Sequence, residues 1–446
     1  MKDLLSRIFR LRSGEAGIVL VLSFLLLANS IAGEISGIMS ISNFVEEGGI
    51  NGILLVWLVD MLLMLLMTGL QSLFIDRFDR LTIMRWMTLG FVMAFVILRL
   101  FFVFGAPGWL NYGIMFLLST QQLLIFPLFF WILANDVFDM AQTKRLFPLI
   151  AGWGFIGSLA GIGFTAVQPG LFEQAGVRNE EVLAFTVLIY LLIYIALQAG
   201  FRKVRLRKTV RKSETVRQTL TEGWGFVREV PSFRYLTLAI LALALCDVVI
   251  EFRFLAIADA VYPDPARYQQ FYSLYRLGFI LVAFAIQTFL TSRIINRVGL
   301  KNTFLVLPFT AFAGAVWMTA LPGIISGVGG MLLQKLPQNT VDESARKALQ
   351  ALVPEERRGR VSIFVDSYLY TGGSIVGVIV TLTIVLLGIW LGIANYFYVY
   401  LAVAAAAALF AIWAIFKMRT VYDSSLFNWR LKRRQRRASV LDKLDF

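Results

Sequence analysis

Long apolar runs alternate with short polar segments along the whole chain. Most runs hold about 20 residues, which is the length that an α-helix needs to cross the hydrocarbon core of a bilayer. No soluble domain of this size needs so much apolar sequence. The pattern predicts twelve membrane-spanning helices, of which the tenth is short and glycine-rich, over residues 17–39, 50–74, 82–104, 109–134, 146–168, 183–201, 235–258, 270–291, 302–321, 323–338, 361–387 and 391–416.

Four charged residues interrupt these runs at corresponding places in the two halves of the chain. Glu34 and Asp60 lie in the first two runs, and Glu251 and Arg276 lie in the seventh and eighth. A charge inside a lipid-length segment is costly and usually marks a pathway or a binding site. Its recurrence predicts a duplicated membrane domain with charged groups near the repeat interface, which is the layout of a secondary transporter.

Two pairs of short motifs indicate that the chain repeats one plan of six helices. The loop FIDRFDRLTIM at 74–84 matches IINRVGLKNTF at 294–304, and GSLAG at 157–161 matches GSIVG at 373–377. Their offsets of 220 and 216 residues agree with 217 for the two glutamates and 216 for the Asp60–Arg276 pair. We therefore expect a six-helix bundle over 1–201, a basic cytoplasmic linker over 202–234, a second bundle over 235–416 and a basic cytoplasmic tail over 417–446.

Glycine-rich segments inside two of the runs look like phosphate loops by composition alone. GWGFIGSLAGIG covers 152–163, and TGGSIVG covers 371–377. Both lie inside predicted spans, where small residues allow two helices to approach closely. We expect helix packing at these segments and no contact with phosphate.

The composition supports a membrane protein: 58% of the residues are hydrophobic and the mean hydropathy is +0.74. The net charge of +14 would suit nucleic acid, but the basic residues gather in the termini and in alternate loops. The loops on the other side hold only Arg178 and Arg267 among six acidic residues. This distribution predicts a multi-pass protein of a bacterial inner membrane with both termini in the cytoplasm. The basic loops would contact anionic lipid, and no nucleic acid is expected.

Several kinds of chemistry are excluded by residues that the chain lacks. The sequence contains no histidine, which excludes histidine-ligated metals and histidine acid–base catalysis. The single cysteine, Cys246, cannot form an intramolecular disulfide. No G-x-x-x-x-G-K-[S/T] loop supports drive by an ATPase. We expect no metal, no cofactor and no enzymatic activity.

A phosphate-bearing solute would need several cations, because arginine and lysine groups replace the water around each phosphate. The basic residues at or near membrane depth are Arg99, Lys144, Arg145, Arg253, Arg276, Arg346 and Lys347. Arg99 has an alternative role at the interface, where its side chain would extend to the headgroups.

Two carboxylates on the seventh run are candidates for proton coupling. Asp247 and Glu251 are one helical turn apart and share a face. If both were ionised they would repel, so one of them would hold a proton. The alternative is a static ion pair with Arg276 or Arg253.

Two further acids have open alternatives. Glu34 is a proton carrier, a partner for Arg99 or Arg276, or an interface residue near the outer surface. Asp60 lies near the centre of the second run without a basic neighbour there. An unpaired central aspartate is costly, so it needs a partner from another helix or a proton.

The D-R-x-x-R element of the loop at 74–84 resembles the signature loop of the major facilitator superfamily. Asp76 and Asp79 would accept from arginines or cap a helix, and Arg77 and Arg80 would anchor at the headgroups. Such charges either hold one gate state closed or serve only topology. The second copy of the loop has Asn296 in place of an acid. We therefore expect the charge network that closes the gate to be weaker in the second half of the chain.

Three segments carry a more specific pattern, in order along the chain. The first, 129–161, contains FFWILAND followed by TKRLFPL; the second, 250–273, has a central acid followed by VYPDP; the third, 342–374, runs from DESARK to TGGS. Together they resemble the nucleotide transporters of plastids and intracellular bacteria, the ATP/ADP translocase family. The matching residues of the first segment are Phe130, Trp131, Ala134, Asn135, Lys144, Arg145, Pro148 and Leu149.

The resemblance implies an ATP-binding carrier that exchanges ATP for ADP. Asn135 would then contact an adenine edge, with capping of the following turn as the alternative. Departures from the family pattern affect the expected substrate. The basic residue that follows the acid of the family's seventh span has no certain counterpart here, although Arg253 lies near. Residues 31–45 hold no basic residue where the family has a lysine for phosphate, and Gln142 stands at or near the place of the family acid. Homology is thus better supported than an unchanged substrate.

These observations predict an all-α membrane protein of twelve transmembrane helices in two six-helix bundles, similar to the major facilitator superfamily. The leading function is secondary transport of an organic anion, a nucleotide by the resemblance, through alternating access. The expected substrate-binding residues are Asn135, Lys144, Arg145, Arg253, Arg276, Arg346 and Lys347. The expected coupling and gating residues are Glu34, Asp60, Asp76, Arg77, Arg80, Asp247 and Glu251. The alternatives are a proton-coupled carrier of another solute and a non-transporting membrane sensor or scaffold.

Overall fold

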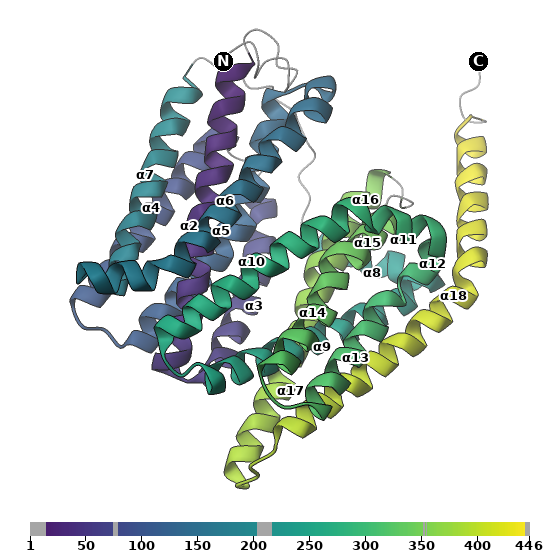
Figure 1. Cartoon of the computed structure of the whole chain (residues 1–446). Helices are drawn as coiled ribbons and strands as arrows, with labels where there is room; N and C mark the ends of the chain where they lie inside the picture. The colour runs from purple at the N-terminus through teal and green to yellow at the C-terminus, as the bar shows by residue number, and fades with distance from the viewer. Residues whose placement is uncertain (1–14, 75–78, 203–215, 351–352, 354, 442–446) are drawn as a thin grey trace. The chain divides into compact units, whose positions relative to one another are not determined.

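The computed structural model describes residues 15–74, 79–202, 216–350, 353 and 355–441 (Figure 1). Every regular element over these residues is helical, which confirms the all-α class. The main helices are α2 (Ala16–Gly48), α3 (Ile53–Phe74), α4 (Arg80–Val103), α5 (Gly108–Val137), α6 (Met140–Ala175), α7 (Val182–Gly200), α8 (Val216–Glu229), α9 (Pro231–Val261), α10 (Pro265–Phe289), α13 (Val306–Ala320), α14 (Ile324–Pro337), α15 (Glu343–Gln350), α16 (Glu355–Ile363), α17 (Tyr370–Trp390) and α18 (Phe397–Leu441).

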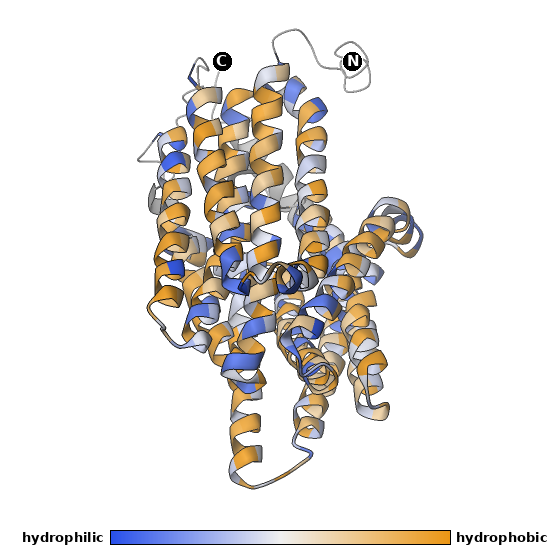
Figure 2. Ribbon diagram, turned by 60° about the vertical axis from the view of Figure 1, so that its left-hand side comes forward, coloured by the Kyte–Doolittle hydropathy of each residue, from blue (hydrophilic) through white to orange (hydrophobic). Residues whose placement is uncertain are grey.

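The predicted spans fall on these helices. Within the described ranges, ten helices are long and apolar enough to cross a membrane, and they account for ten of the twelve predicted runs. The seventh and tenth runs coincide with α9 and α14. Figure 2 shows apolar residues along most of the length of the helices.

The twelfth run begins later than predicted. The sequence places its start at 391, but α17 continues to Trp390 and α18 begins only at Phe397. Gly392 has a φ of 65°, in the left-handed region that glycine adopts without strain. A residue in this conformation ends a helix, so the turn between α17 and α18 is set here.

Contacts divide the chain into two compact units. Unit 1 comprises Met1–Asp60, Gly69–Ser213 and Tyr262–Gly278, and unit 2 comprises Met61–Thr68, Glu214–Val261 and Phe279–Phe446. By its packing, the first part of α10 therefore belongs to unit 1. The domain boundaries expected at 201 and 234 stay a prediction.

Each unit packs its helices by the same plan. In unit 1, α2 contacts α5, α6 and α7, and α4 contacts α5 and α7. In unit 2, α9 contacts α14, α17 and α18, and α13 contacts α14 and α18. In both units the first helix thus packs on the fourth, fifth and sixth, and the third packs on the fourth and sixth. This common plan agrees with the six-helix repeat expected from the motif offsets.

The glycine motifs lie where the first and fifth helices of each unit meet. A Cβ atom on Gly157 would lie 2.4 Å from the carbonyl oxygen of Leu27, and one on Gly373 would lie 2.7 Å from that of Leu241. Only glycine allows backbones to approach so closely. The prediction that these segments serve helix packing is confirmed.

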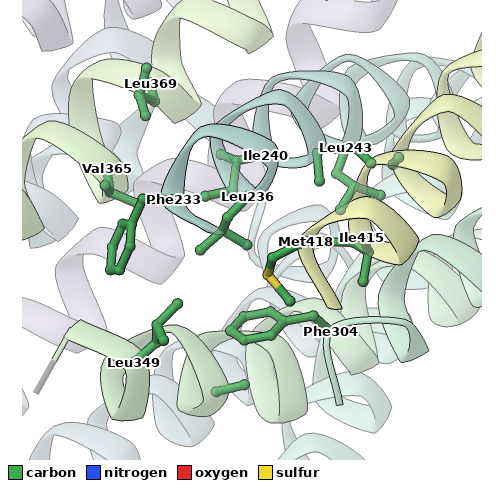
Figure 3. Packing of buried hydrophobic residues seen from close by; sticks show 14 of the residues in the cluster. Phe233, Leu236, Ile240, Leu243, Phe304, Leu349, Val365, Leu369, Ile415 and Met418 are labelled. Carbon is green, nitrogen blue, oxygen red and sulfur yellow. The ribbon is translucent and has the colours of Figure 1, made fainter. Parts of the chain in front are cut away.

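The core of unit 2 holds short polar segments in place by apolar packing (Figure 3). Leu236 and Ile240 of α9 belong to one buried cluster with Leu349 of α15. Val365 and Leu369 belong to the same cluster and lie in a π-helical segment, Phe364–Leu369, between α16 and α17. A second π-helical segment, Gln338–Asp342, joins α14 to α15. π-Helical turns are rare and occur frequently at functional sites.

Candidate functional site

A lysine that the sequence analysis missed lies between two carboxylates of α9. The Nζ atom of Lys335, on α14, is 2.9 Å from Oδ2 of Asp247 and 2.8 Å from Oε2 of Glu251. Only 19% of the Lys335 side chain is exposed. The expectation that Asp247 and Glu251 share a face is confirmed. The expected cationic partner was wrong, because α14 brings Lys335 to these acids.

Hydrogen bonds extend this ion pair onto α17. The Tyr370 hydroxyl donates to Asp247, and the Gln338 side-chain amide donates to the Tyr370 oxygen at 2.8 Å. Inside a protein such connected bonds are stronger than in water, and an unpaired member is costly. Lys335 is therefore fixed by groups from three helical elements.

A pocket of about 310 Å³ opens beside Lys335 in unit 2. Its lining comes from α14, α15, the start of α17 and both π-helical segments. The lining residues are Lys335, Gln338, Asn339, Glu343, Arg346, Lys347, Asp366 and Tyr370. The sequence analysis named Arg346 and Lys347, and the structure brings both to this pocket.

Carboxylates neutralise the other two cations of the pocket. The Arg346 guanidinium lies 2.8 Å from Asp342 and 3.2 Å from Asp366, and Lys347 lies 2.7 Å from Asp366. Burial opposes the charge of Arg346, but Asp342 and Asp366 raise its pKa, so the arginine stays cationic. Burial raises the pKa of Asp342, and Arg346 opposes this effect. The pocket thus holds cations that already have partners.

Arg253 and Arg276 do not contact Asp247 or Glu251 but have other partners. The Arg253 guanidinium lies 3.9 Å from the centre of the Phe397 ring, a cation–π contact at the start of α18. Glu251 pairs with Lys335 of α14 instead of with Arg253. Arg276 lies 2.7 Å from Glu34, within unit 1, which is one of the alternatives expected for Glu34.

A seam of buried polar groups continues from the Glu34–Arg276 pair. The Gln269 side-chain amide donates to the Thr165 carbonyl oxygen at 3.0 Å and to Gln168 at 2.7 Å. Ser273 lies 3.1 Å from the Thr165 hydroxyl. The first part of α10 is therefore held to α2 and α6 by polar contacts.

Asp60 is buried on α3 and forms no ion pair with any residue that the structure describes. It is 3% exposed, and the Thr120 side chain of α5 is its polar neighbour from another helix. Its Oδ1 atom has no hydrogen-bond partner among the residues that the structure describes. The expected partner from another helix is thus a neutral hydroxyl, which leaves the carboxyl group with the cost of burial.

The other predicted cations of unit 1 do not line the pocket. Arg145 contacts both carboxylate oxygens of Glu15, at 2.7 and 2.8 Å, and Gln142 donates to the same group at 3.0 Å. Lys144 is exposed. Arg99 pairs with Glu181 at 2.6 Å, with both side chains near half exposure.

Asn135 does not cap the following helix, contrary to one of its two expected roles. Its side-chain amide donates to the Trp131 carbonyl oxygen at 2.8 Å, within α5. α5 continues to Val137, and Asp139 caps α6 through a capping box with Gln142. The sequence placed the end of the helix too early.

The signature loop is described only in part. Asp76 and Arg77 lie outside the described residues. Asp79 caps α4 by accepting from the Thr82 backbone amide at 3.2 Å, which was one of its expected roles. Arg80 pairs with Asp136 at the end of α5, and its side chain is mostly buried; anchoring of Arg80 at the headgroups stays a prediction.

Solved structures with the same fold are membrane transporters. The POT family transporter PepTSo superposes with a TM-score of 0.62 at 11% identity, covering 93% of this chain and 99% of that chain. A bacterial homologue of the iron transporter ferroportin, in an inward-facing state, gives 0.62 at 14% identity over 92% and 99%. The nucleoside transporter NupG gives 0.60 at 13% over 91% and 100%. The chain shares its fold with these solved transporters.

The sequence comparison identifies the family. The model of the TLC ATP/ADP transporter family matches residues 101–327, which is half of the chain. No curated protein sequence matches the chain significantly. The chain is a membrane transporter and belongs to the TLC ATP/ADP transporter family, as a divergent member.

Proposed function

We propose that this protein is a secondary transporter that exchanges organic anions, with a nucleotide as solute, through alternating access and without ATP hydrolysis. The observation that carries this proposal is the pocket with three cations, Lys335, Arg346 and Lys347. The family supports the solute class, because a nucleotide presents several phosphate oxygens that need cations.

In this proposal the phosphates bind by exchange of partners. Arg346 presents a planar fork that suits two phosphate oxygens, and Lys347 adds a flexible point charge. Carboxylates hold both cations at 2.7 to 3.2 Å. The solute would replace carboxylate oxygens with phosphate oxygens, so that no buried cation is left unpaired at any stage.

Unit 1 contributes gating in the same proposal. The Glu34–Arg276 pair and the polar seam around Gln269 would loosen and re-form as the carrier changes state. The basic termini and linker would lie in the cytoplasm of a bacterial cell, against anionic lipid.

Uptake of radiolabelled ATP into liposomes preloaded with ADP tests the proposal. We expect uptake that requires internal ADP and that Arg346→Gln reduces at least about tenfold, because one charge-assisted contact contributes roughly 1.5–3 kcal/mol. Empty liposomes and Arg178→Gln, an exposed arginine paired locally with Glu180, serve as controls. Folded protein that gives no ADP-dependent uptake would remove the nucleotide from the proposal.

A proton-coupled carrier of another solute is the second candidate. It is favoured by Asp247 and Glu251, which share the single ammonium group of Lys335. The groups that face these acids are Lys335 and Gln338, together with Tyr370 from α17. When a solute anion withdraws Lys335, the two acids would be left close together, and one would take up a proton.

Glu251→Gln is expected to abolish transport or to uncouple it from pH. The amide keeps the shape of the side chain but cannot release a proton. The measurement is the initial uptake rate between pH 5 and 8. The control is Glu173→Gln, because Glu173 is exposed and has no role in the proposed coupling. A wild-type rate and pH profile in Glu251→Gln would exclude this residue from coupling.

A further inference from the structure

Asp366 is the only acid of the pocket lining that bridges two of its cations, among the residues described. It comes from the π-helical segment before α17, whereas both cations lie on α15. Its two oxygens lie 3.2 Å from Arg346 Nη1 and 2.7 Å from Lys347 Nζ. The Asp366 side chain is 21% exposed and forms part of the pocket wall.

The second acid on Arg346 has a different position. Asp342 lies one helical turn before Arg346 and approaches its Nε atom at 2.8 Å. Its side chain is 11% exposed and does not line the pocket. Asp342 therefore binds Arg346 on the side away from the pocket. This contact would keep the guanidinium in place if Asp366 moved away.

We propose that Asp366 is a resident anion that stands where an oxyanion group of the solute binds, and that it thereby sets which anions the pocket accepts. The inference rests on the proposed function for the identity of the site. It concerns the chemistry of binding, which can be measured without transport.

Because Asp366 is part of the chain, a competing anion has to bind Arg346 and Lys347 more strongly than this carboxylate does. A monocarboxylate offers the cations the same two oxygens as Asp366 and has to be recruited from solution, so it cannot displace the aspartate. A diphosphate offers more oxygens and more charge, and it can engage the Arg346 fork and Lys347 together. The pocket therefore selects multivalent oxyanions over monovalent ones.

The local backbone supports such a displacement. Asp366 lies in a π-helical turn, where the regular i to i−4 hydrogen bonds are interrupted. The flanking Phe364, Val365 and Leu369 side chains are buried in the unit 2 core and hold the segment at both ends. When the Asp366 side chain moves, the backbone on both sides of it therefore stays in place.

Titration of the purified full-length protein with inorganic pyrophosphate and with acetate tests the inference. Asp366→Asn should lower the pyrophosphate Kd at least about tenfold and allow acetate to bind, because a charged competitor has been removed. Asp423→Asn removes an equal charge from an exposed pair with Lys301 in the same unit and should change neither Kd. Asp366→Glu should resemble the wild type, and adding Arg346→Gln to Asp366→Asn should remove the gain.

Two results would overturn the inference: a pyrophosphate Kd that Asp366→Asn leaves unchanged or raises, or no pyrophosphate binding by any variant. If Asp366→Asn does not fold, Asp366→Ser makes the same comparison. Tighter pyrophosphate binding by Asp366→Asn, in a protein that does not exchange ATP for ADP, would support the inference and contradict only the proposed function. Exchange without the gain in affinity would do the reverse.

Discussion

Lys335→Met is expected to abolish transport and to lower the free energy of unfolding by about 3–5 kcal/mol. The substitution keeps an apolar stem of similar length and removes the ammonium group that lies between Asp247 and Glu251. Two carboxylates on one helical face then repel each other in a poorly hydrated site. The measurement is thermal unfolding in one detergent, together with uptake into liposomes.

The matched control for this prediction is Lys301→Met. Lys301 pairs with one carboxylate, that of Asp423, and this pair is exposed. Exposed pairs contribute at most about 1 kcal/mol, so the control should unfold near the wild-type temperature. Adding Asp247→Asn and Glu251→Gln to Lys335→Met should recover stability without recovering transport. Equal stability of Lys335→Met and the wild type would show that the ion pairs of Lys335 with Asp247 and Glu251 contribute little to the free energy of unfolding.

Gly373→Val is expected to destabilise unit 2 far more than Gly372→Val does. A Cβ at Gly373 would lie 2.7 Å from the Leu241 carbonyl oxygen and 2.8 Å from Ala244 Cβ. The backbone of α9 cannot move aside as a flexible side chain would, and overpacking of this kind costs about 1–3 kcal/mol or more. At Gly372, the adjacent residue of the same helix, nothing lies within 4 Å of the added atom.

The same comparison in unit 1 uses Gly157→Val, with Gly163→Val as its control. A Cβ at Gly157 would lie 2.4 Å from the Leu27 carbonyl oxygen, and Gly163 has open space. Melting temperatures and yields of folded protein should separate both pairs in the same direction. If Gly373→Val and Gly157→Val unfold at the same temperatures as their controls, the close packing of the first and fifth helices is not a source of stability.

The sequence predicted the helices and their repetition well, because both depend on local patterns. A run of about 20 apolar residues specifies a spanning helix without reference to neighbours. The glycine motifs were also interpretable, since a small residue inside a span has few uses besides close packing. The position of the first and fifth helices follows from those motifs.

The partners of the charged residues could not be predicted in the same way. Lys335 stands in LLQKLPQN, near the end of a short glycine-rich run, where a lysine looks like a boundary signal. Its role depends on the register of α14 against α9, which no local pattern specifies. The presence of two acids one turn apart was the available signal, because such a pair needs a cation from another helix.

The pocket itself was predicted only in part. Arg346 and Lys347 were named as basic residues at or near membrane depth, but the aspartates that hold them were not singled out. Asp366 lies 19 residues from Lys347, on the far side of α16 along the chain. Distances of this kind are set by the packing of the core in Figure 3 and not by sequence spacing.

The central claim is that Lys335, Arg346 and Lys347 form one binding site for a phosphate-bearing anion. Equilibrium binding of radiolabelled ATP to the purified full-length protein tests it most directly. We expect saturable binding by the wild type that unlabelled pyrophosphate displaces, and loss of this binding when Arg346 and Lys347 are both changed to glutamine. Saturable binding that survives the double substitution at wild-type affinity would place the anion site elsewhere and contradict the account.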